Sequence, residues 1–233
     1  MGALAAACLA AAPAFACRVA LAMGLDVSAS VDAREYRLQI DGVAAALNAP
    51  SVRDVLFGAP GGPVAVAVYE WSGWEDKRVL VDWTVLSDAD ALAHVTRRLL
   101  GTERIEMSDS TALGMALLEG ATLLDRAPAC WRRVIDISGD GKNNDGVDPD
   151  MLDGEPGLAG VTVNALVIGA DNRREVDRRA VTIGDLASYF MAHVIRGPDA
   201  FVQVALGFED YERAMTRKLL RELQPAAMSA LSP

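Results

Sequence analysis

The sequence predicts an α/β domain of the doubly wound type: a mostly parallel, six-stranded sheet with one antiparallel edge strand and helices on both faces. Two observations predict this class. Apolar runs of strand length alternate along the chain with segments whose apolar residues recur at helical spacing. The chain has 233 residues, of which 52% are hydrophobic, and this is enough to bury one core without metals or disulfides holding it together.

Most of the predicted strands are short apolar runs that end at a polar residue or a turn. The first run, 18–25, ends at Asp26, and the second, 64–69, follows the turn-forming residues 58–63. Residues 77–81 alternate polar and apolar, which predicts an edge strand reached by a short hairpin from the second strand. The remaining predicted strands are 134–137, 161–168 and 200–205.

The segments between these strands have helical periodicity. The first helix is expected to stop at the Asn-Ala-Pro sequence of residues 48–50, and Ser87 is expected to cap the second helix. We therefore expect one domain over residues 17–224, followed by a flexible tail, 225–233. The predicted helices are 32–47, 87–100, 111–124, 185–194 and 208–223.

The charge balance argues against two classes of partner. The chain has 22 Lys and Arg residues against 32 Asp and Glu, which gives a net charge of −10. A surface this acidic repels phosphate groups, so nucleic acids and anionic membranes are poor candidate partners.

The beginning of the chain has the composition of an export signal. Residues 1–16 are uncharged, rich in Ala and too short to span a bilayer, and they end in the A-x-A cleavage signature Ala14-Phe15-Ala16. We expect a signal peptide that is removed on export to a periplasm, although the usual positively charged start is missing, and no membrane span in the mature chain. The alternative is an apolar N-terminal helix packed on the domain.

Two cysteines, Cys17 and Cys130, would remain after cleavage. Each lies just ahead of an apolar run, and the two runs are expected to form neighbouring parallel strands, so the thiols can come within the separation that a disulfide needs. An oxidising compartment would preserve this bond. Lipidation of Cys17, or two unpaired thiols in the core, are the alternatives to the favoured disulfide.

Polar residues collect at the carboxyl ends of the predicted strands, where ligands bind in a doubly wound sheet. The first strand is followed by a D-x-S-x-S run of Asp26, Ser28 and Ser30. The fourth strand carries Asp140 to the same edge, and the helix that begins at Thr111 opens there too. These five residues supply only oxygen, which suits a hard divalent cation, and their few carboxylates suit Mg²⁺ or Mn²⁺ that keeps bound waters. The cage is incomplete, which leaves a coordination position for water or for another oxygen.

The order of these residues resembles the metal-ion-dependent adhesion site of von Willebrand factor type A domains: D-x-S-x-S, then Thr111, then Asp140. The similarity extends from Arg18 to Leu223 and implies the Rossmann-like fold of those domains. The DVSASVDAREY start, the WSG after the second strand, STALGMAL, VIDISGDGKNN and the late GPDAF…KLLREL are similar to an exported bacterial group, the domain of unknown function 1194 family.

The resemblance also implies a role for each residue of the site. Ser28, Ser30 and Thr111 would bind the metal directly through their hydroxyl groups. Asp26 and Asp140 would hold bound waters or complete the coordination sphere. The sixth position would take a carboxylate from a partner protein. The segment before Asp140 departs from the family's commoner Thr-Asp-Gly, because it reads Ser-Gly-Asp-Gly here.

Three more residues near this edge are candidates for contact with a partner: Trp71, Trp74 and Asn143. Exposed tryptophans would form a contact surface there, and packing under the hairpin is the alternative for both of them. The loop that holds Asn143 fails the EF-hand pattern, so we expect it to be acidic and solvated. Asp136, four residues before Asp140, is expected to be a buried structural carboxylate and not a ligand.

Together these observations predict an exported, metal-dependent module, not an enzyme, that binds an acidic residue on an unknown protein partner. One alternative is a metal-dependent hydrolase, which is less favoured because the sequence offers no activated nucleophile, general base or cationic clamp around the metal. The other is a structural envelope subunit in which the metal site is vestigial.

Overall fold

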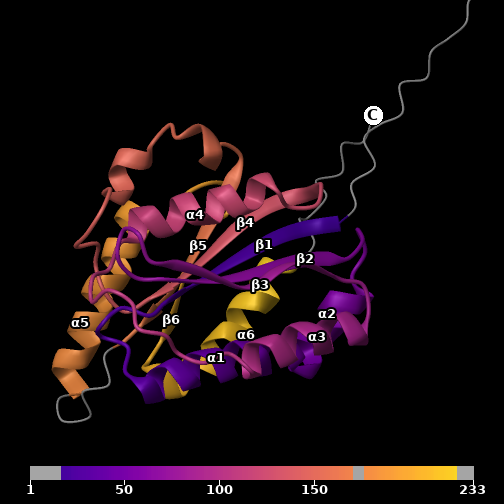
Figure 1. Ribbon diagram of the computed structural model, residues 1–233, viewed down its shortest axis with the longest axis horizontal. Helices are drawn as coiled ribbons and strands as arrows, with labels where there is room; N and C mark the ends of the chain where they lie inside the picture. Colours follow the sequence, from indigo (N-terminus) through magenta and orange to yellow (C-terminus); the bar gives the residue numbers. More distant parts are fainter. Residues whose placement is uncertain (1–16, 170–175, 225–233) are drawn as a thin grey trace, which may run out of the picture.

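A computed structural model describes residues 17–169 and 176–224 of the chain. The expected signal peptide and the expected C-terminal tail lie outside these residues. A single six-stranded sheet runs through the middle of the molecule (Figure 1). Its strands are β1 (Cys17–Asp26), β2 (Val64–Trp71), β3 (Lys77–Leu86), β4 (Cys130–Gly139), β5 (Val161–Ile168) and β6 (Val202–Ala205).

The sheet has the order β3-β2-β1-β4-β5-β6. Neighbouring strands are parallel throughout, except that β3 pairs antiparallel with β2 at the edge. The winding therefore reverses beside β1, which lies in the centre of the sheet. This architecture confirms the predicted class of a mostly parallel, doubly wound sheet with one antiparallel edge strand.

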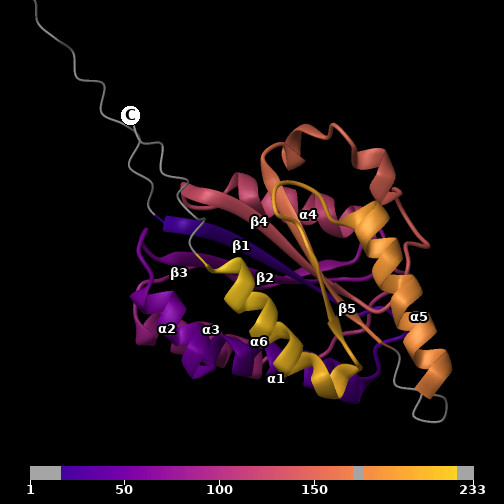
Figure 2. The same ribbon diagram turned by 180° about the vertical axis from the view of Figure 1, so that it is seen from behind.

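Helices cover both faces of the sheet (Figures 1 and 2). Four of them pack on one face: α1 (Ala33–Asn48), α2 (Pro50–Gly58), α3 (Ala89–Leu100) and α6 (Tyr211–Glu222). The other face is covered by α4 (Leu113–Asp125) and by α5 (Val176–Tyr189), which continues into a π-helical turn over Phe190–Val194. Short 3₁₀ turns occupy Pro149–Leu152, Pro156–Leu158 and Phe208–Asp210.

Because both faces are covered, the central strands are buried along their whole length. In β1, Leu21, Met23 and Leu25 join the core under α1 and α6. Ala20 and Ala22 face α4 instead, and their small side chains let that helix pack close to the sheet. Among the described residues, no helix is both long and apolar enough to cross a membrane.

Several boundaries differ from the predictions. The first helix ends at Asn48, as predicted from the Asn-Ala-Pro sequence, but Pro50 is also the first residue of an unpredicted helix, α2, where its missing N–H is not needed. The cap of α3 is Asp88 and not Ser87, since the Asp88 carboxylate accepts the Ala91 N–H at 2.9 Å. The strand expected over 77–81 extends to Leu86.

The carboxyl-terminal third also differs in detail. The helix expected over 185–194 begins at Val176 and ends in the π-helical turn. The last helix begins at Tyr211, after a 3₁₀ turn over the first residues of the predicted segment. These shifts leave the order of the elements unchanged.

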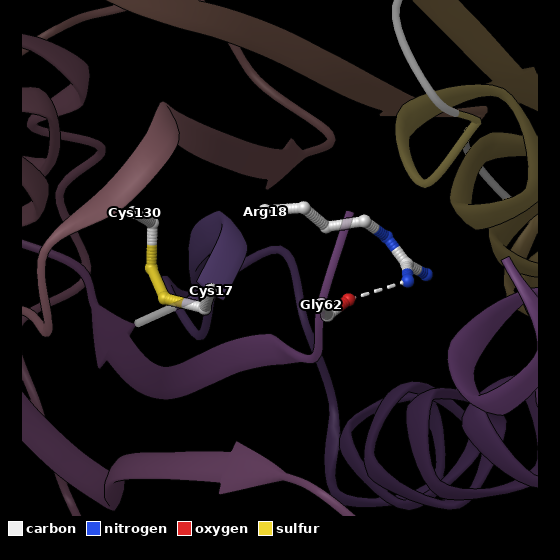
Figure 3. Close-up of a disulfide and its surroundings, with 4 residues drawn as sticks. All are labelled: Cys17, Arg18, Gly62 and Cys130. Carbon is white, nitrogen blue, oxygen red and sulfur yellow. Dashed lines mark hydrogen bonds between the residues drawn. A yellow bond between two sulfur atoms is a disulfide. The ribbon is translucent and has the colours of Figure 1, made fainter. Parts of the chain in front are cut away.

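Cys17 and Cys130 face each other in register on β1 and β4, and a disulfide joins them with a Cα–Cα distance of 4.5 Å (Figure 3). This is the pairing that the sequence predicted. The buried Arg18 beside it donates hydrogen bonds to the carbonyls of Val55 (2.6 Å) and Gly62 (2.8 Å). The disulfide and Arg18 thus fasten the amino-terminal end of β1, and the polar residues of the predicted site lie at its other end.

Candidate metal centre

Three segments of the chain meet at the carboxyl ends of the central strands. Asp26 is the last residue of β1. Leu25 pairs with Ser138 in register, so β1 and β4 end level with each other and Asp140 follows directly after β4. Thr111 lies two residues before the start of α4. The fold therefore brings the predicted residues together from positions up to 114 residues apart, because 140 − 26 = 114.

The turn after β1 is built by Asp26 itself. Its Oδ1 accepts the N–H of Ser28 at 2.9 Å, a local bond that bends the backbone sharply after the strand. The carbonyl of Ser28 then accepts the N–H of Val31 at 3.0 Å. Asp32 caps α1, through a capping box with Glu35, so Ser30 is not needed as a cap. Both serine hydroxyls are thereby left for the site.

The hydroxyl groups lie against one another and against Asp140. Ser28 Oγ is 3.2 Å from Ser30 Oγ and 3.4 Å from Thr111 Oγ1. Ser30 Oγ donates a hydrogen bond to Asp140 Oδ1 at 2.6 Å. Asp26 joins this group through the hydrogen bond that its Oδ1 accepts from the Ser28 N–H. All five predicted residues therefore meet in one continuous set of polar contacts.

The loop after β4 fixes the position of Thr111. The Thr111 N–H donates to Asn144 Oδ1 at 2.8 Å, and the Asn144 N–H donates back to the Thr111 carbonyl at 3.0 Å. On the other side, the Ala112 N–H donates to the carbonyl of Ser72 at 2.7 Å. The contact with Ser28 comes from Thr111 and not from its neighbour Ser110, whose N–H bonds to Ser108.

The electrostatics of the site are those of two carboxyl groups held close together. Asp26 is fully buried, and this burial, followed by the negative charge of Asp140, raises its pKa to about 7. Burial also raises the pKa of Asp140. A divalent cation would favour the charged form of both groups, because its field opposes both effects.

One atom of the site is left without a well-formed hydrogen bond. Asp26 Oδ2 is buried, and among the described residues no hydrogen bond of normal geometry reaches it. Such an oxygen is costly unless something satisfies it, and a cation or a cation-bound water would do so. In the described part of the chain, no group of three His, Cys, Asp or Glu side chains is arranged to hold a metal, so this site depends on its hydroxyl groups. Hydroxyl and carboxylate oxygens are the ligands that Mg²⁺ and Mn²⁺ prefer, and the residues fit such an ion.

The glycine before Asp140 has a steric explanation. A Cβ atom on Gly139 would lie 3.2 Å from Cζ of Phe190 and 3.4 Å from Oδ2 of Asp26. Phe190 opens the π-helical turn and is fully buried there. The departure from the commoner Thr-Asp-Gly therefore makes room for an aromatic ring that closes one side of the site.

The three residues expected to contact a partner have different surroundings. Trp71 is completely buried, which contradicts a role as a contact surface and agrees with the packing alternative. Its register partner on β1 is Asp26, so both side chains lie on the same covered face of the sheet. Trp74 is 55% exposed at the tip of the β2–β3 hairpin. Asn143 is half-buried, and its Oδ1 accepts the N–H of Gly114 at 3.4 Å, so it supports the start of α4.

The loop around Asn143 is solvated, as expected, since Asn144, Asp148 and Asp150 are exposed, but its side chains also hold neighbouring segments in place. Asn144 holds Thr111, and Asp145 Oδ2 accepts the N–H of Trp74 at 3.0 Å. Another positioning residue was missed: the buried Gln39 donates from Nε2 to the carbonyl of Asp26 at 2.9 Å. Its place on the apolar face of the first helix was the available signal, since a polar residue there needs a buried partner.

Comparison with known proteins places the chain in a family. The family model described as "Protein of unknown function (DUF1194)" matches residues 16–227. None of the curated proteins matches the sequence.

Several solved structures have the same fold. A von Willebrand factor type A protein from Catenulispora acidiphila is 15% identical, with a TM-score of 0.54 over 89% of this chain and 42% of its own. Proximal thread matrix protein 1 from the mussel byssus, solved with a zinc-occupied MIDAS motif, is 17% identical, with a TM-score of 0.56 over 89% and 46%. The pilus adhesin SpaC from Lactobacillus rhamnosus GG is 13% identical, with a TM-score of 0.58 over 89% and 30%.

This chain spans less than half the length of each of these three structures. At such low identity the likeness shows the fold alone. Together with the family match it leads to one conclusion: the chain belongs to the DUF1194 family and has the fold of a von Willebrand factor type A domain.

Proposed function

We propose that this protein is an exported binding module that holds Mg²⁺ or Mn²⁺ and uses it to capture a carboxylate of a partner protein. One observation carries the proposal: three hydroxyl groups and two carboxyl groups from three segments meet at one point, where no well-formed hydrogen bond from the described residues satisfies the buried Asp26 Oδ2. This arrangement has the oxygen chemistry of a cation site and too few ligands to complete one.

The neutral and the charged residues of the site would have different roles. Ser28, Ser30 and Thr111 would hold the ion with neutral oxygens, and Asp26 and Asp140 would balance part of its charge. An ion bound mainly by neutral oxygens remains strongly electrophilic and attracts an added carboxylate. The hydrogen bond from Ser28 to Asp26 and those between Thr111 and Asn144 keep these oxygens in place before the ion arrives.

A binding role is favoured over hydrolysis by the contacts of the hydroxyl groups. In the described residues they bond to one another and to Asp140, and no His, Lys or Arg side chain bonds to them. Among the described residues, the base in contact with these hydroxyl groups is the Asp140 carboxylate, and a bound cation would engage its charge, so no free general base would remain to activate a serine or threonine as a nucleophile. The similar structures also include a pilus adhesin and a matrix protein with an occupied MIDAS motif, which supports adhesion as the role.

Export is the second part of the proposal. The disulfide between Cys17 and Cys130 is of a kind that persists in oxidising compartments such as the periplasm. The uncharged, Ala-rich start with its cleavage signature supports a signal peptide over residues 1–16.

A capture experiment tests this function. The immobilised wild-type chain is incubated with a periplasmic extract in Mg²⁺, and the bound protein is released with EDTA, with acetate or with acetamide. We expect EDTA and concentrated acetate to release the partner, because one removes the ion and the other competes for it, and acetamide to leave it bound. A Ser30→Ala chain is expected to capture nothing. A partner that binds Ser30→Ala equally, or that resists EDTA, contradicts the proposal.

A further inference from the structure

A lysine lies completely buried between two carboxyl groups beneath the last helix, away from the residues of the metal site. Lys218 of α6 is 0% exposed, and Asp136 of β4 and Glu222 of α6 are each 1% exposed. Lys218 Nζ lies 2.6 Å from Asp136 Oδ1 and 2.5 Å from Glu222 Oε1. Burying ionised groups costs several kcal/mol for each ion, and two carboxylates around one ammonium leave a surplus negative charge. The arrangement therefore calls for a chemical explanation.

The two contacts of Lys218 are of different kinds. Nζ donates a hydrogen bond to Glu222 Oε1, which also accepts one from Asn164 Nδ2 at 2.7 Å. The contact with Asp136 is nearly as short, at 2.6 Å, and is an ion pair. Glu222 thus holds the amine against the Asp136 carboxyl group.

The surroundings favour the neutral form of Asp136. Burial, followed by the charge of Glu222, raises the pKa of Asp136 to about 7, so a large share of this carboxyl is protonated at neutral pH. A protonated carboxyl is the form that an amine can attack. The ring of Phe201 lies 5.5 Å from Lys218 Nζ. The backbone N–H of Phe201 donates a hydrogen bond to Asn164 Oδ1 at 3.1 Å. Water has little access to these buried groups. The condensation of an amine with a carboxylic acid is therefore not reversed by hydrolysis as readily as it would be at the surface.

We propose that Lys218 and Asp136 are joined by an intramolecular amide bond, formed by the folded chain itself with Glu222 as the proton carrier. The nucleophile (Lys218), the electrophile (Asp136) and the base (Glu222) are already in contact. Such positioning within one molecule greatly raises the effective concentration of the reacting groups. The bond would tie α6 to β4, the strand that leads to Asp140.

The step balances without another reactant. The Glu222 carboxylate takes one proton from the Lys218 ammonium, and the Nζ lone pair attacks Cγ of the protonated Asp136 carboxyl. A C–N bond forms, and the bond from Cγ to the hydroxyl oxygen breaks. The hydroxyl group leaves as water with a second proton from Nζ. The products are a neutral amide, one water and a protonated Glu222, so no buried charge remains and nothing is oxidised or reduced.

Mass spectrometry of the purified full chain tests the bond directly. After denaturation and reduction, the chain is expected to be lighter by one water than the mass calculated for its sequenced N-terminus. Trypsin is expected to leave Lys218 uncut and to release a branched peptide that joins residues 134–142 to residues 218–221. The branched peptide identifies the bond, because an Asp-Gly sequence elsewhere can also lose water. A full sequence mass, with cleavage after Lys218, overturns the proposal.

Two variants test the role of Glu222. Glu222→Gln keeps the size of the side chain but removes the proton acceptor, and it is expected to yield the full sequence mass and no branched peptide. Glu212→Gln, on the exposed side of the same helix, is the matched control and is expected to retain the bond. A branched peptide in Glu222→Gln overturns the role assigned to Glu222. The wild-type measurement requires no variant to fold, so it decides the existence of the bond by itself.

Discussion

Replacing Asp26 by Asn is expected to stabilise the metal-free chain and, at the same time, to abolish metal binding. The Asp26 carboxyl is fully buried, and its burial and the nearby Asp140 raise its pKa from 3.8 to about 7. Above pH 7 the folded chain therefore carries a buried negative charge, one of whose oxygens accepts no hydrogen bond of normal geometry from the described residues. Asn has nearly the same shape without the charge, so it removes this penalty.

The magnitude follows from the two pKa values. A rise from 3.8 in the unfolded chain to about 7 in the folded chain lowers the free energy of unfolding by about 4 kcal/mol at pH 8. Asn retains an oxygen that can accept the Ser28 N–H, but its amino group gains no acceptor, which costs about 1–3 kcal/mol. We therefore expect Asp26→Asn to be more stable than wild type by about 1–3 kcal/mol at pH 8.

The sign of the pH dependence gives a second check. Because the folded-state pKa lies above the unfolded-state value, the wild-type chain is stabilised by this group in acid and loses that stability as the pH rises from about 4 to about 7. At pH 5 most of the folded chain has Asp26 protonated, so the charge penalty is less than half of its value at pH 8. The advantage of Asp26→Asn is expected to shrink or reverse there.

Urea unfolding in EDTA, at pH 5 and pH 8, measures these differences. With Mg²⁺ at a hundred times its Kd, only the wild-type chain is expected to gain stability, by about 2.7 kcal/mol. Asp109→Asn, which removes an exposed carboxylate near the site, is the matched control and should change neither result. A metal-free Asp26→Asn chain that is less stable than wild type at pH 8 would refute the reasoning.

Three other perturbations have defined outcomes. Gly139→Thr is expected to lower the free energy of unfolding by about 1–3 kcal/mol, because the added Cβ approaches Phe190 at 3.2 Å; adding Phe190→Leu should recover part of this loss in thermal unfolding. Trp74→Ala is expected to leave the metal affinity unchanged in calorimetry and to weaken partner binding, since its side chain is exposed and no site oxygen bonds to it. Replacing Cys17 and Cys130 by Ala is expected to lower stability in urea by about 4–5 kcal/mol, because the disulfide closes a loop of 113 residues. Unchanged stability in Gly139→Thr or in the chain without the disulfide would contradict these expectations, and so would a loss of metal affinity in Trp74→Ala.

Most of the fold could be predicted from local patterns, because the parallel strands contain continuous apolar runs, the antiparallel edge strand alternates polar and apolar residues, and the crossover helices are amphipathic. The α2 helix could not be predicted, since proline is favourable both just after the end of one helix and at the first position of the next. The position of the cap at Asp88 was missed by one residue for a similar reason, because Ser87 and Asp88 are both good caps and only the backbone geometry distinguishes them.

The candidate site could be predicted as a set of residues but not as a set of contacts. The strand ends and the D-x-S-x-S run place the five oxygen-bearing residues at one edge. The burial of Trp71 depends on its register opposite Asp26, which a single sequence does not reveal. The cluster of Lys218, Asp136 and Glu222 also depends on how α6 docks on β4 and β5, a long-range contact with no local signal.

The central claim is that the five residues bind a divalent cation, and calorimetric titration of the chain with Mg²⁺ and Mn²⁺ tests it most directly. Thr111→Ala and Ser110→Ala form a matched pair, because the two hydroxyls are neighbours and only that of Thr111 contacts Ser28. We predict saturable binding of one ion per chain in the wild type, lost in Thr111→Ala and retained in Ser110→Ala. Absence of binding in the wild type, or equal binding in Thr111→Ala, would contradict the account.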